Sequence, residues 1–179
     1  MGSYVKSIPP DKLEEFATAL AAVHVKYELL LRFGIETGYR VSDCLKMRAG
    51  RFSKRLRLFE SKTSKFREVE ISDELLAHGH NYIEEQRLSH SDALFFSARH
   101  RKYKPLSRAQ VWVVFSRVAA SLGISNIGAH SMRKAFAMNL MQETNSIHEV
   151  QKALGHKHVE TTLRYLFNFE KLGDILGLV

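Results

Sequence analysis

The segment "ALGHKHVETTLRY" sets a glycine and a histidine at a predicted helix end and a tyrosine, Tyr165, nine residues after that histidine. Leu163 and Leu166 already fill the apolar positions around Tyr165, so its hydroxyl interrupts an apolar face. A tyrosine in this position is either an ordinary amphipathic core residue or a nucleophile that forms a covalent intermediate. The choice depends on which groups the fold places beside the hydroxyl.

Four cationic or titratable side chains elsewhere in the chain have the chemistry to assist such a nucleophile. His130 and Arg133 are three residues apart on a predicted helix, where Cβ atoms are ~5–6 Å apart and both side chains can contact one phosphate. Arg40 and His156 each follow closely on a glycine that ends a helix. An isolated arginine is usually solvated, and a helix-end histidine often contacts the last carbonyl groups. Taken singly, none of these residues indicates a site.

The elements that must position these residues are mainly helical. Apolar residues recur at the helical period along most of the chain, and capping residues or glycines stand at the expected ends. A further helix is expected over "HSMRKAFAMNLM". The predicted starts are Asp11 with Glu14, Ser107, and Ser146 with Glu149, and the predicted ends are Gly38, Gly123 and Gly155.

Between Phe52 and Ile71 the period of the pattern changes to two. In "RLRLFESKTSKFREVEI" the residue types alternate on both sides of the polar stretch "ESKTSK". We expect an antiparallel hairpin with Lys62 near its tip. The predicted fold class is α+β, mainly α-helical with a small antiparallel β-sheet.

The composition indicates a basic domain with a polyanionic partner. The chain has 179 residues, with 27 Lys and Arg against 19 Asp and Glu, a formal net charge of +8 and a pI near 9.7. This balance favours the neutralisation of phosphates. The single cysteine, Cys44, is predicted to be core, excludes an intrachain disulfide and favours a reducing compartment. No run approaches the ~18 apolar residues of a membrane span, so we expect a soluble, cytoplasmic protein.

Four segments resemble the catalytic domain of the tyrosine recombinases, also called the phage integrase family. They are "TGYRVSDCL", "ESKTSK", "GAHSMRKAFAMNL" and "LGHKHVETTLRY", and they occur in the order and spacing of the family between Thr37 and Tyr165. The resemblance implies the fold of that domain and site-specific DNA recombination without a metal, a cofactor or ATP. It also implies that Asp43 orients its neighbours. The implied catalytic residues are Arg40, Lys62, His130, Arg133, His156 and Tyr165.

The residue types agree with the implied chemistry, in which the tyrosine attacks a phosphate to form a 3′-phosphotyrosine. A tyrosine with a pKa near 10 is only ~0.1% phenolate at pH 7, a penalty of roughly 4 kcal/mol, so it needs cations or a base nearby. Arg40, Arg133 and His130 would supply them, and guanidinium groups stabilise the charge on the phosphate oxygens. Lys62 is the predicted general acid for the departing 5′ oxygen, His130 the candidate base and His156 a donor to the phosphate.

Two other functional classes explain parts of the sequence. A Mg²⁺-dependent nuclease would use Asp43, Glu60 and Lys62, because Glu60-Ser61-Lys62 is a Glu-x-Lys motif with an acidic residue upstream. A catalytically silent DNA-binding module would use "ARHRKYK" and the arginines for phosphate contacts alone. The nuclease leaves Tyr165 unexplained, and the intact tyrosine and hairpin lysine count against the silent module. The scattered histidines do not have zinc-ligand spacing.

We expect one catalytic domain over residues 1–179, without a separate N-terminal core-binding domain and with residues 1–3 as an expression scar. The expected partners are double-stranded DNA and other protomers of the same recombinase. In the tail "LFNFEKLGDILGLV" apolar residues fall at i, i+3, i+6 and i+7. Family tails commonly dock on a neighbouring subunit, so we expect a monomer whose tail supports assembly on DNA, as in a tetramer. The apolar tail residues are Phe169, Leu172, Ile175 and Leu176.

Overall fold

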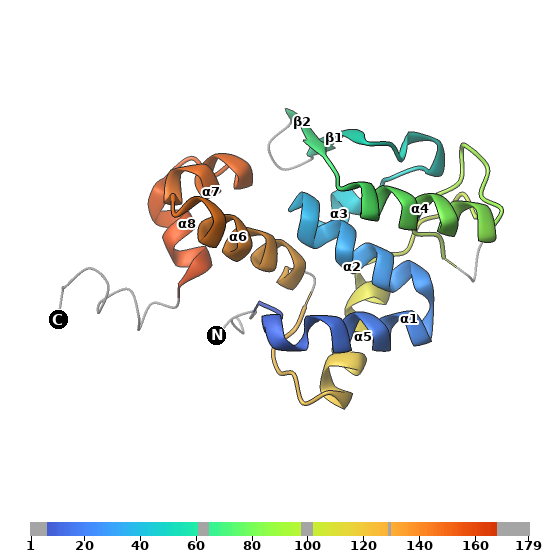
Figure 1. Cartoon of the computed structure of the whole chain (residues 1–179), viewed down its shortest axis with the longest axis horizontal. Helices are drawn as coiled ribbons and strands as arrows, with labels where there is room; N and C mark the ends of the chain where they lie inside the picture. Colours follow the sequence, from blue (N-terminus) through green and yellow to red (C-terminus); the bar gives the residue numbers. More distant parts are fainter. Residues whose placement is uncertain (1–6, 61–64, 98–101, 129, 168–179) are drawn as a thin grey trace.

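The structure is a computed structural model that describes residues 7–60, 65–97, 102–128 and 130–167 (Figure 1). Within these ranges the chain is mainly helical with one antiparallel hairpin, which confirms the predicted fold class. In chain order the elements are η1 (Pro10–Lys12), α1 (Leu13–Val23), α2 (Val25–Thr37), α3 (Val41–Cys44), η2 (Ala49–Arg51), β1 (Arg55–Glu60), β2 (Lys65–Glu70), α4 (Asp73–Glu85), α5 (Arg108–Ser121), α6 (Ser131–Thr144), α7 (Ile147–Leu154) and α8 (Val159–Leu166).

Helix α2 lies at the centre of the larger hydrophobic core. Leu29, Leu30 and Leu31 on this helix are fully buried, because α1, α4 and α6 all pack against it. Helix α5 packs against α1, where the ring of Phe115 meets that of Phe16 edge-on with 5.6 Å between the ring centroids. A helix that is apolar on most sides must be surrounded in this way, and it gives the site a rigid base.

The end of α2 depends on a glycine. Gly38 has a φ of +63°, a conformation that side chains rarely adopt, and a Cβ atom there would lie 2.3 Å from the ring of Phe136. Only glycine adopts this positive φ readily and also leaves room for the Phe136 ring. The chain therefore leaves α2 in a tight turn, and Arg40 becomes the residue immediately before α3.

Strands β1 and β2 pair from Arg55 opposite Glu70 to Glu60 opposite Lys65. Every second residue of β1 faces the body of the protein and is buried, and the last of these inward residues is Glu60. The hydroxyl of Tyr39 donates a hydrogen bond of 2.6 Å to the carbonyl oxygen of Arg67 on β2. The hairpin is thus attached to the turn that carries Arg40.

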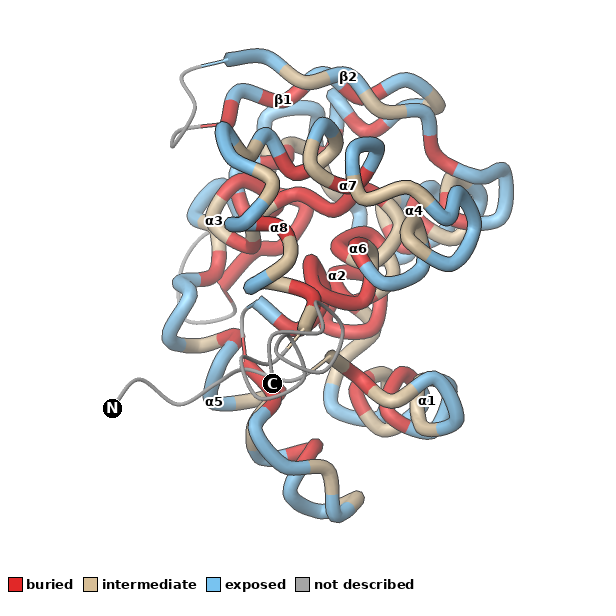
Figure 2. The backbone as a smooth tube through the Cα atoms, turned by 90° about the vertical axis from the view of Figure 1, so that its left-hand side faces the viewer, coloured by how far each residue is buried: buried red, intermediate tan, exposed pale blue. Residues whose placement is uncertain are grey.

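Helix α6 continues from the larger core into a smaller one that it forms with α7 and α8. Figure 1 shows α7 and α8 beside α6, on the opposite side of the molecule from α4. Figure 2 shows α3 and α5 along one edge of the molecule and α1 and α4 along the other. The buried residues of the smaller core are Ala137, Val150, Leu154 and Leu166.

Two predicted helix starts are wrong in detail. Asp11 lies inside η1, and α1 begins at Leu13 without a side-chain cap, because the proline at the first position of η1 already fixes the first turn. His130 is the residue before α6, so it and Arg133 do not form the predicted pair within one helix. Among the described residues, no helix is long and apolar enough to cross a membrane.

Candidate active site

The carboxylate of Glu60 lies at the centre of a cluster of arginine side chains. Its Oε1 atom is 3.2 Å from Arg133 Nη1, 3.4 Å from Arg40 Nη1 and 3.7 Å from Arg67 Nε. The Glu60 side chain is only 5% exposed, so these charges interact with little screening by water. Three guanidinium groups around one carboxylate leave an excess of positive charge, which suits a site for an anion.

Arg133 connects three separate elements through this cluster. Its Nη1 atom donates to the carbonyl oxygen of Gly38 after α2, and its Nη2 atom donates to that of Leu154 at the end of α7, both at 2.7 Å. A cation is favourable beside the last carbonyl groups of a helix. Arg133 therefore holds the Arg40 turn, the hairpin end and the α7–α8 unit in fixed relation.

Arg40 is the more accessible of the two arginines predicted to be catalytic. Its side chain is 15% exposed, against 4% for Arg133. Its Nη1 atom is buried and forms the ion pair with Glu60, but no hydrogen bond with any residue that the structure describes. One turn later, the buried Asp43 forms an ion pair of 3.3 Å with Lys46. The role of Asp43 in orienting its neighbours stays a prediction.

Tyr165 lies between two of the predicted histidines. Its hydroxyl donates a long hydrogen bond of 3.4 Å to the carbonyl oxygen of His130, and its ring meets the imidazole of His156 edge-on at a centroid distance of 5.8 Å. The Nδ1 atom of His156 is 3.0 Å from the hydroxyl oxygen of Thr162, which is fully buried. This contact sets the orientation of the imidazole ring beside the tyrosine.

The pKa of Arg133 depends on burial and on the charged groups around it. Burial lowers the pKa of Arg133, and the positive charge of Arg40 lowers that pKa further. Glu60 and the ionised form of Tyr165 both act in the opposite direction and raise that pKa. Because an arginine pKa is so high, Arg133 stays charged and stabilises negative charge placed near it.

Arg67 belongs to the cluster but was not predicted from the sequence. Its Nη2 atom donates to the carbonyl oxygen of Thr37 at 2.7 Å, and its guanidinium lies 4.0 Å from the centroid of the Tyr39 ring. Burial lowers its pKa. The signal for it is the strand alternation, because Arg67 stands opposite the inward-facing Leu58. A charged residue at an inward position indicates a buried partner.

The geometry gives Glu60 a different role from the one that the nuclease interpretation requires. Glu60 is paired with arginines and Asp43 with Lys46, so both carboxylates face cations of the protein itself. Over the described ranges, no group of three or more His, Cys, Asp and Glu side chains is arranged to hold a metal ion. The interpretation based on Mg²⁺ therefore gains no set of ligands from this structure.

Five of the six predicted catalytic residues lie in two groups of contacts, the arginine cluster around Glu60 and the contacts of Tyr165 with the two histidines. The sixth residue, Lys62, falls outside the described residues. It follows Glu60 by two positions. The apolar tail residues predicted to dock on a neighbour, 169–176, also lie outside the described ranges. Their predicted roles are not tested by these contacts.

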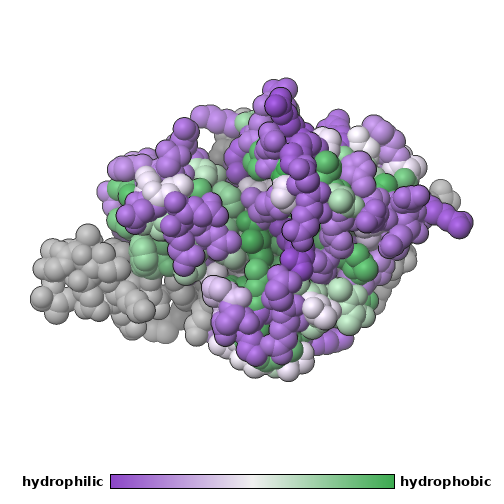
Figure 3. Space-filling view, viewed as in Figure 1, coloured by the Kyte–Doolittle hydropathy of each residue, from purple (hydrophilic) through white to green (hydrophobic). Residues whose placement is uncertain are grey.

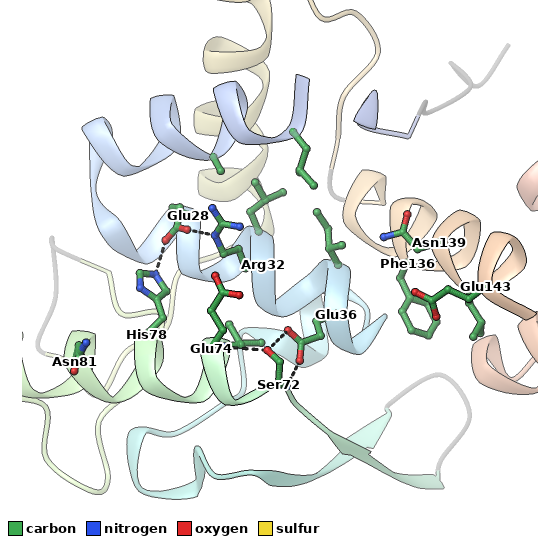
Figure 4. Close-up of a pocket in the computed structure, with 16 residues that line it drawn as sticks. Glu28, Arg32, Glu36, Ser72, Glu74, His78, Asn81, Phe136, Asn139 and Glu143 are labelled. Atoms are coloured by element: carbon green, nitrogen blue, oxygen red, sulfur yellow. Dashed lines mark hydrogen bonds and ion pairs between the residues drawn. The ribbon is translucent and has the colours of Figure 1, made fainter. Parts of the chain in front are cut away.

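A hollow of about 680 Å³ lies between α1, α2, α4 and α6, away from the catalytic cluster (Figure 4). Glu28 binds both Arg32 and His78 there, and Glu36 binds Ser72. Figure 3 shows hydrophobic residues at the bottom of a cleft in this face and hydrophilic residues along its edges. Four glutamates and one arginine line the hollow, so it is unsuited to a phosphate.

Comparison with known proteins gives consistent matches over nearly the whole chain. The model of the phage integrase family matches residues 6–171. The probable integrase/recombinase YoeC of Bacillus subtilis is 32% identical over 87% of this chain and 85% of its own length. Tyrosine recombinase XerA of Pyrococcus horikoshii is 29% identical over 91% of this chain but only 57% of its own length.

Solved structures show the same fold. XerH site-specific recombinase bound to difH in a post-cleavage complex gives a TM-score of 0.73 at 22% identity, covering 97% of this chain and 53% of XerH. XerA recombinase gives 0.74 at 19% identity, covering 98% of this chain and 66% of XerA. The chain thus spans about half to two thirds of these longer proteins. It belongs to the phage integrase family and corresponds to the tyrosine recombinase catalytic domain.

Proposed function

We propose that this domain cuts and rejoins DNA with Tyr165 as the nucleophile. The phenolic oxygen attacks the scissile phosphorus, the bond from phosphorus to the 5′ oxygen breaks, and that oxygen leaves with a proton. The phosphate stays bound to Tyr165 as a 3′-phosphotyrosine. Attack by a 5′ hydroxyl reverses the step and needs no ATP, because one phosphodiester bond replaces another.

The observation that carries the proposal is the position of the Tyr165 hydroxyl. It contacts the backbone carbonyl group of His130, and its ring packs edge-on against the imidazole of His156. A tyrosine that served only as a core residue would not need its hydroxyl at the backbone of His130 and its ring against the imidazole of His156. Fixed cations around a nucleophile are the arrangement that stabilises a negatively charged transition state.

Arg40 and Arg133 are the proposed ligands of the nonbridging phosphate oxygens. Arg40 is the first point of contact, because its side chain is 15% exposed against 4% for Arg133. Arg133 already bonds two backbone carbonyl groups, so it supplies a charge of fixed position. A pre-positioned guanidinium costs little reorganisation when charge develops on the phosphate.

His156, His130 and Lys62 are the proposed proton and hydrogen-bond donors. The contact of His156 with Thr162 holds its ring in one orientation, which supports a role in binding a phosphate oxygen. His130 is the candidate base, since its backbone lies at the tyrosine hydroxyl. Lys62 is the proposed general acid for the 5′ oxygen, because a lysine ammonium can supply the proton that this oxygen needs on leaving.

Double-stranded DNA is the proposed substrate, and several protomers are proposed to assemble on it. The net charge of +8 favours a polyanion. Among the solved relatives, XerH is bound to its difH substrate, and lambda integrase forms a tetramer bound to a Holliday junction. We propose that residues 1–179 act as one catalytic domain in such an assembly.

Covalent capture tests this function and separates it from the two alternatives. The protein is incubated with a library of nicked duplexes in EDTA, and adducts are resolved on a denaturing gel. We expect an adduct that resists denaturation and is released by protease. Cleavage that requires Mg²⁺ and leaves no adduct would favour the nuclease instead. DNA binding without cleavage under either condition would favour a silent binding module.

A further inference from the structure

A basic hollow of about 520 Å³ lies beside the end of α3, and no role in the catalytic chemistry has been given to it. Its described lining contains three cationic side chains, an imidazole and two hydroxyl groups, and no carboxylate. We propose that this hollow binds a backbone phosphate of the DNA duplex at a distance from the phosphate that is cut. The proposal rests on the proposed function. The residues of the basic hollow are Lys46, Arg48, Arg51, His90, Ser91 and Tyr103.

The backbone holds the basic hollow open in the unliganded protein. The amide of Gly50 donates to the carbonyl oxygen of His90 at 3.1 Å, and that of Ala49 donates to the carbonyl oxygen of Asp92 at 3.0 Å. A Cβ atom on Gly50 would lie 2.0 Å from the His90 ring, so the glycine allows the imidazole to pack directly on the backbone. A preformed site binds its ligand with less loss of conformational entropy.

Arg48 and Arg51 supply the positive charge in two different ways. Arg48 is fixed, because its Nη1 atom donates to the carbonyl oxygens of Tyr103 at 2.6 Å and Ser91 at 3.3 Å. Arg51 is exposed at the end of η2 and forms no ion pair with any residue that the structure describes. A guanidinium held by the backbone beside an exposed one suits a phosphate oxygen that reaches the site from solvent.

Among the ion pairs of the described residues, one involves a cation of the basic hollow, the pair of Lys46 with Asp43. The carboxylate of Asp92 caps its own turn, accepting from the amide and hydroxyl of Ser89 at 2.7 and 2.8 Å. Asp43 pairs with Lys46 at 3.3 Å, and it is buried while the lysine side chain is half exposed. The basic hollow therefore keeps a net positive charge, which favours an anion.

The location of the hollow points to duplex DNA as the source of that anion. The Asp43–Lys46 pair joins the hollow to the short helix that follows Arg40, so the hollow and the catalytic cluster are neighbours along α3. Figure 2 shows α3 on the same edge of the molecule as α5 and opposite α1 and α4, where the acidic hollow lies. A duplex bound at Arg40 would continue along this basic edge rather than across the acidic face.

The salt dependence of DNA binding tests the proposal with a matched control. Affinity for a duplex of arbitrary sequence is measured over a series of salt concentrations for the unchanged protein and for Arg51→Ala, Arg51→Lys and Lys12→Ala. Lys12 is an exposed cation outside the basic hollow, where it pairs with Glu15. Its replacement by alanine changes the net charge of the protein by the same amount as Arg51→Ala. We expect Arg51→Ala to reduce the slope of log K against log salt by about 1, with the slope retained in Arg51→Lys and in Lys12→Ala.

Equal slopes for Arg51→Ala and Lys12→Ala would overturn the proposal, provided that circular dichroism shows both proteins folded. A second arm replaces sodium chloride with sodium phosphate at equal ionic strength. If phosphate displaced DNA from the unchanged protein more strongly than from Arg51→Ala, the two ligands would compete for this site, as the proposal expects. Binding of inorganic phosphate that is lost in Arg51→Ala, together with equal DNA slopes for Arg51→Ala and Lys12→Ala, would mean that the ligand is free phosphate rather than the DNA backbone. Failure of covalent capture with the slopes as expected would reject the proposed function and leave the phosphate site standing.

Discussion

Arg133 Nη1 lies 3.2 Å from Glu60 Oε1, and both side chains are at least nine-tenths buried. Removing one partner of a buried ion pair leaves uncompensated charge and typically costs about 3–5 kcal/mol. We therefore expect Glu60→Ala to lower the free energy of unfolding by about 3 kcal/mol or more in urea titrations. The control is Glu68→Ala, which removes an exposed pair with Arg57 and should cost less than about 1 kcal/mol. Equal losses for the two variants would contradict this assignment.

Tyr39 makes the free energy of unfolding decrease at alkaline pH. Its hydroxyl donates to the carbonyl oxygen of Arg67, and burial raises its pKa to about 12 from an ordinary value of 10.0. Because the folded state holds the proton more tightly, the stabilisation is complete below pH 10 and is lost as the pH rises towards 12. Tyr39→Phe should cost about 1 kcal/mol at neutral pH and show a shallower alkaline decline in urea titrations. An unchanged decline would contradict the assignment.

The local parts of the fold are predictable because they depend on neighbouring residues. Ser107 begins α5 with a reciprocal capping box, and Ser146 caps α7 through the amide of Glu149. The glycines at 38 and 155 end α2 and α7 in left-handed conformations, as their positions in the pattern indicate. The alternation on both sides of "ESKTSK" predicts the hairpin, and the register confirms it.

The arginine cluster is not predictable in the same way, since it depends on contacts between residues far apart in the chain. Glu60 and Arg133 are separated by 73 positions, and the sequence alone suggests a metal ligand for Glu60 as readily as an arginine partner. Strand alternation shows only that Glu60 shares a face with Leu56 and Leu58. The family resemblance supplied Arg40, His130 and Tyr165 as a set, but their spatial relation needed the structure.

The role of Lys62 as general acid is testable by changing the leaving group. Lys62→Ala should cleave normal DNA poorly, because the departing 5′ oxygen needs a proton. On a substrate with a 5′-bridging phosphorothiolate, the thiolate leaves without protonation, so cleavage by Lys62→Ala should recover. Lys65→Ala, at the exposed start of β2, is the matched control and should cut both substrates normally. A defect of equal size on both substrates would mean that Lys62 only positions DNA.

The tail after α8 is predicted to support assembly on DNA. Truncation after Asn168 removes the apolar residues of the tail and leaves the described helices intact. We expect thermal unfolding and binding of one protomer to be largely unchanged, with weaker multimeric complexes in light scattering on DNA. An unfolded truncated protein would show that the tail completes its own core. Unimpaired assembly would show that the tail has no role in it.

The most direct test of the account is the identity of the residue that becomes bound to DNA. Tyr165→Phe and the control Tyr27→Phe, which changes a tyrosine near the start of α2, are compared on nicked duplexes that the unchanged protein captures. The account predicts that Tyr165→Phe binds these duplexes but forms no adduct, that Tyr27→Phe forms a normal amount, and that mass spectrometry finds the nucleotide on Tyr165. An undiminished adduct with Tyr165→Phe, or a nucleotide on another residue, would contradict it.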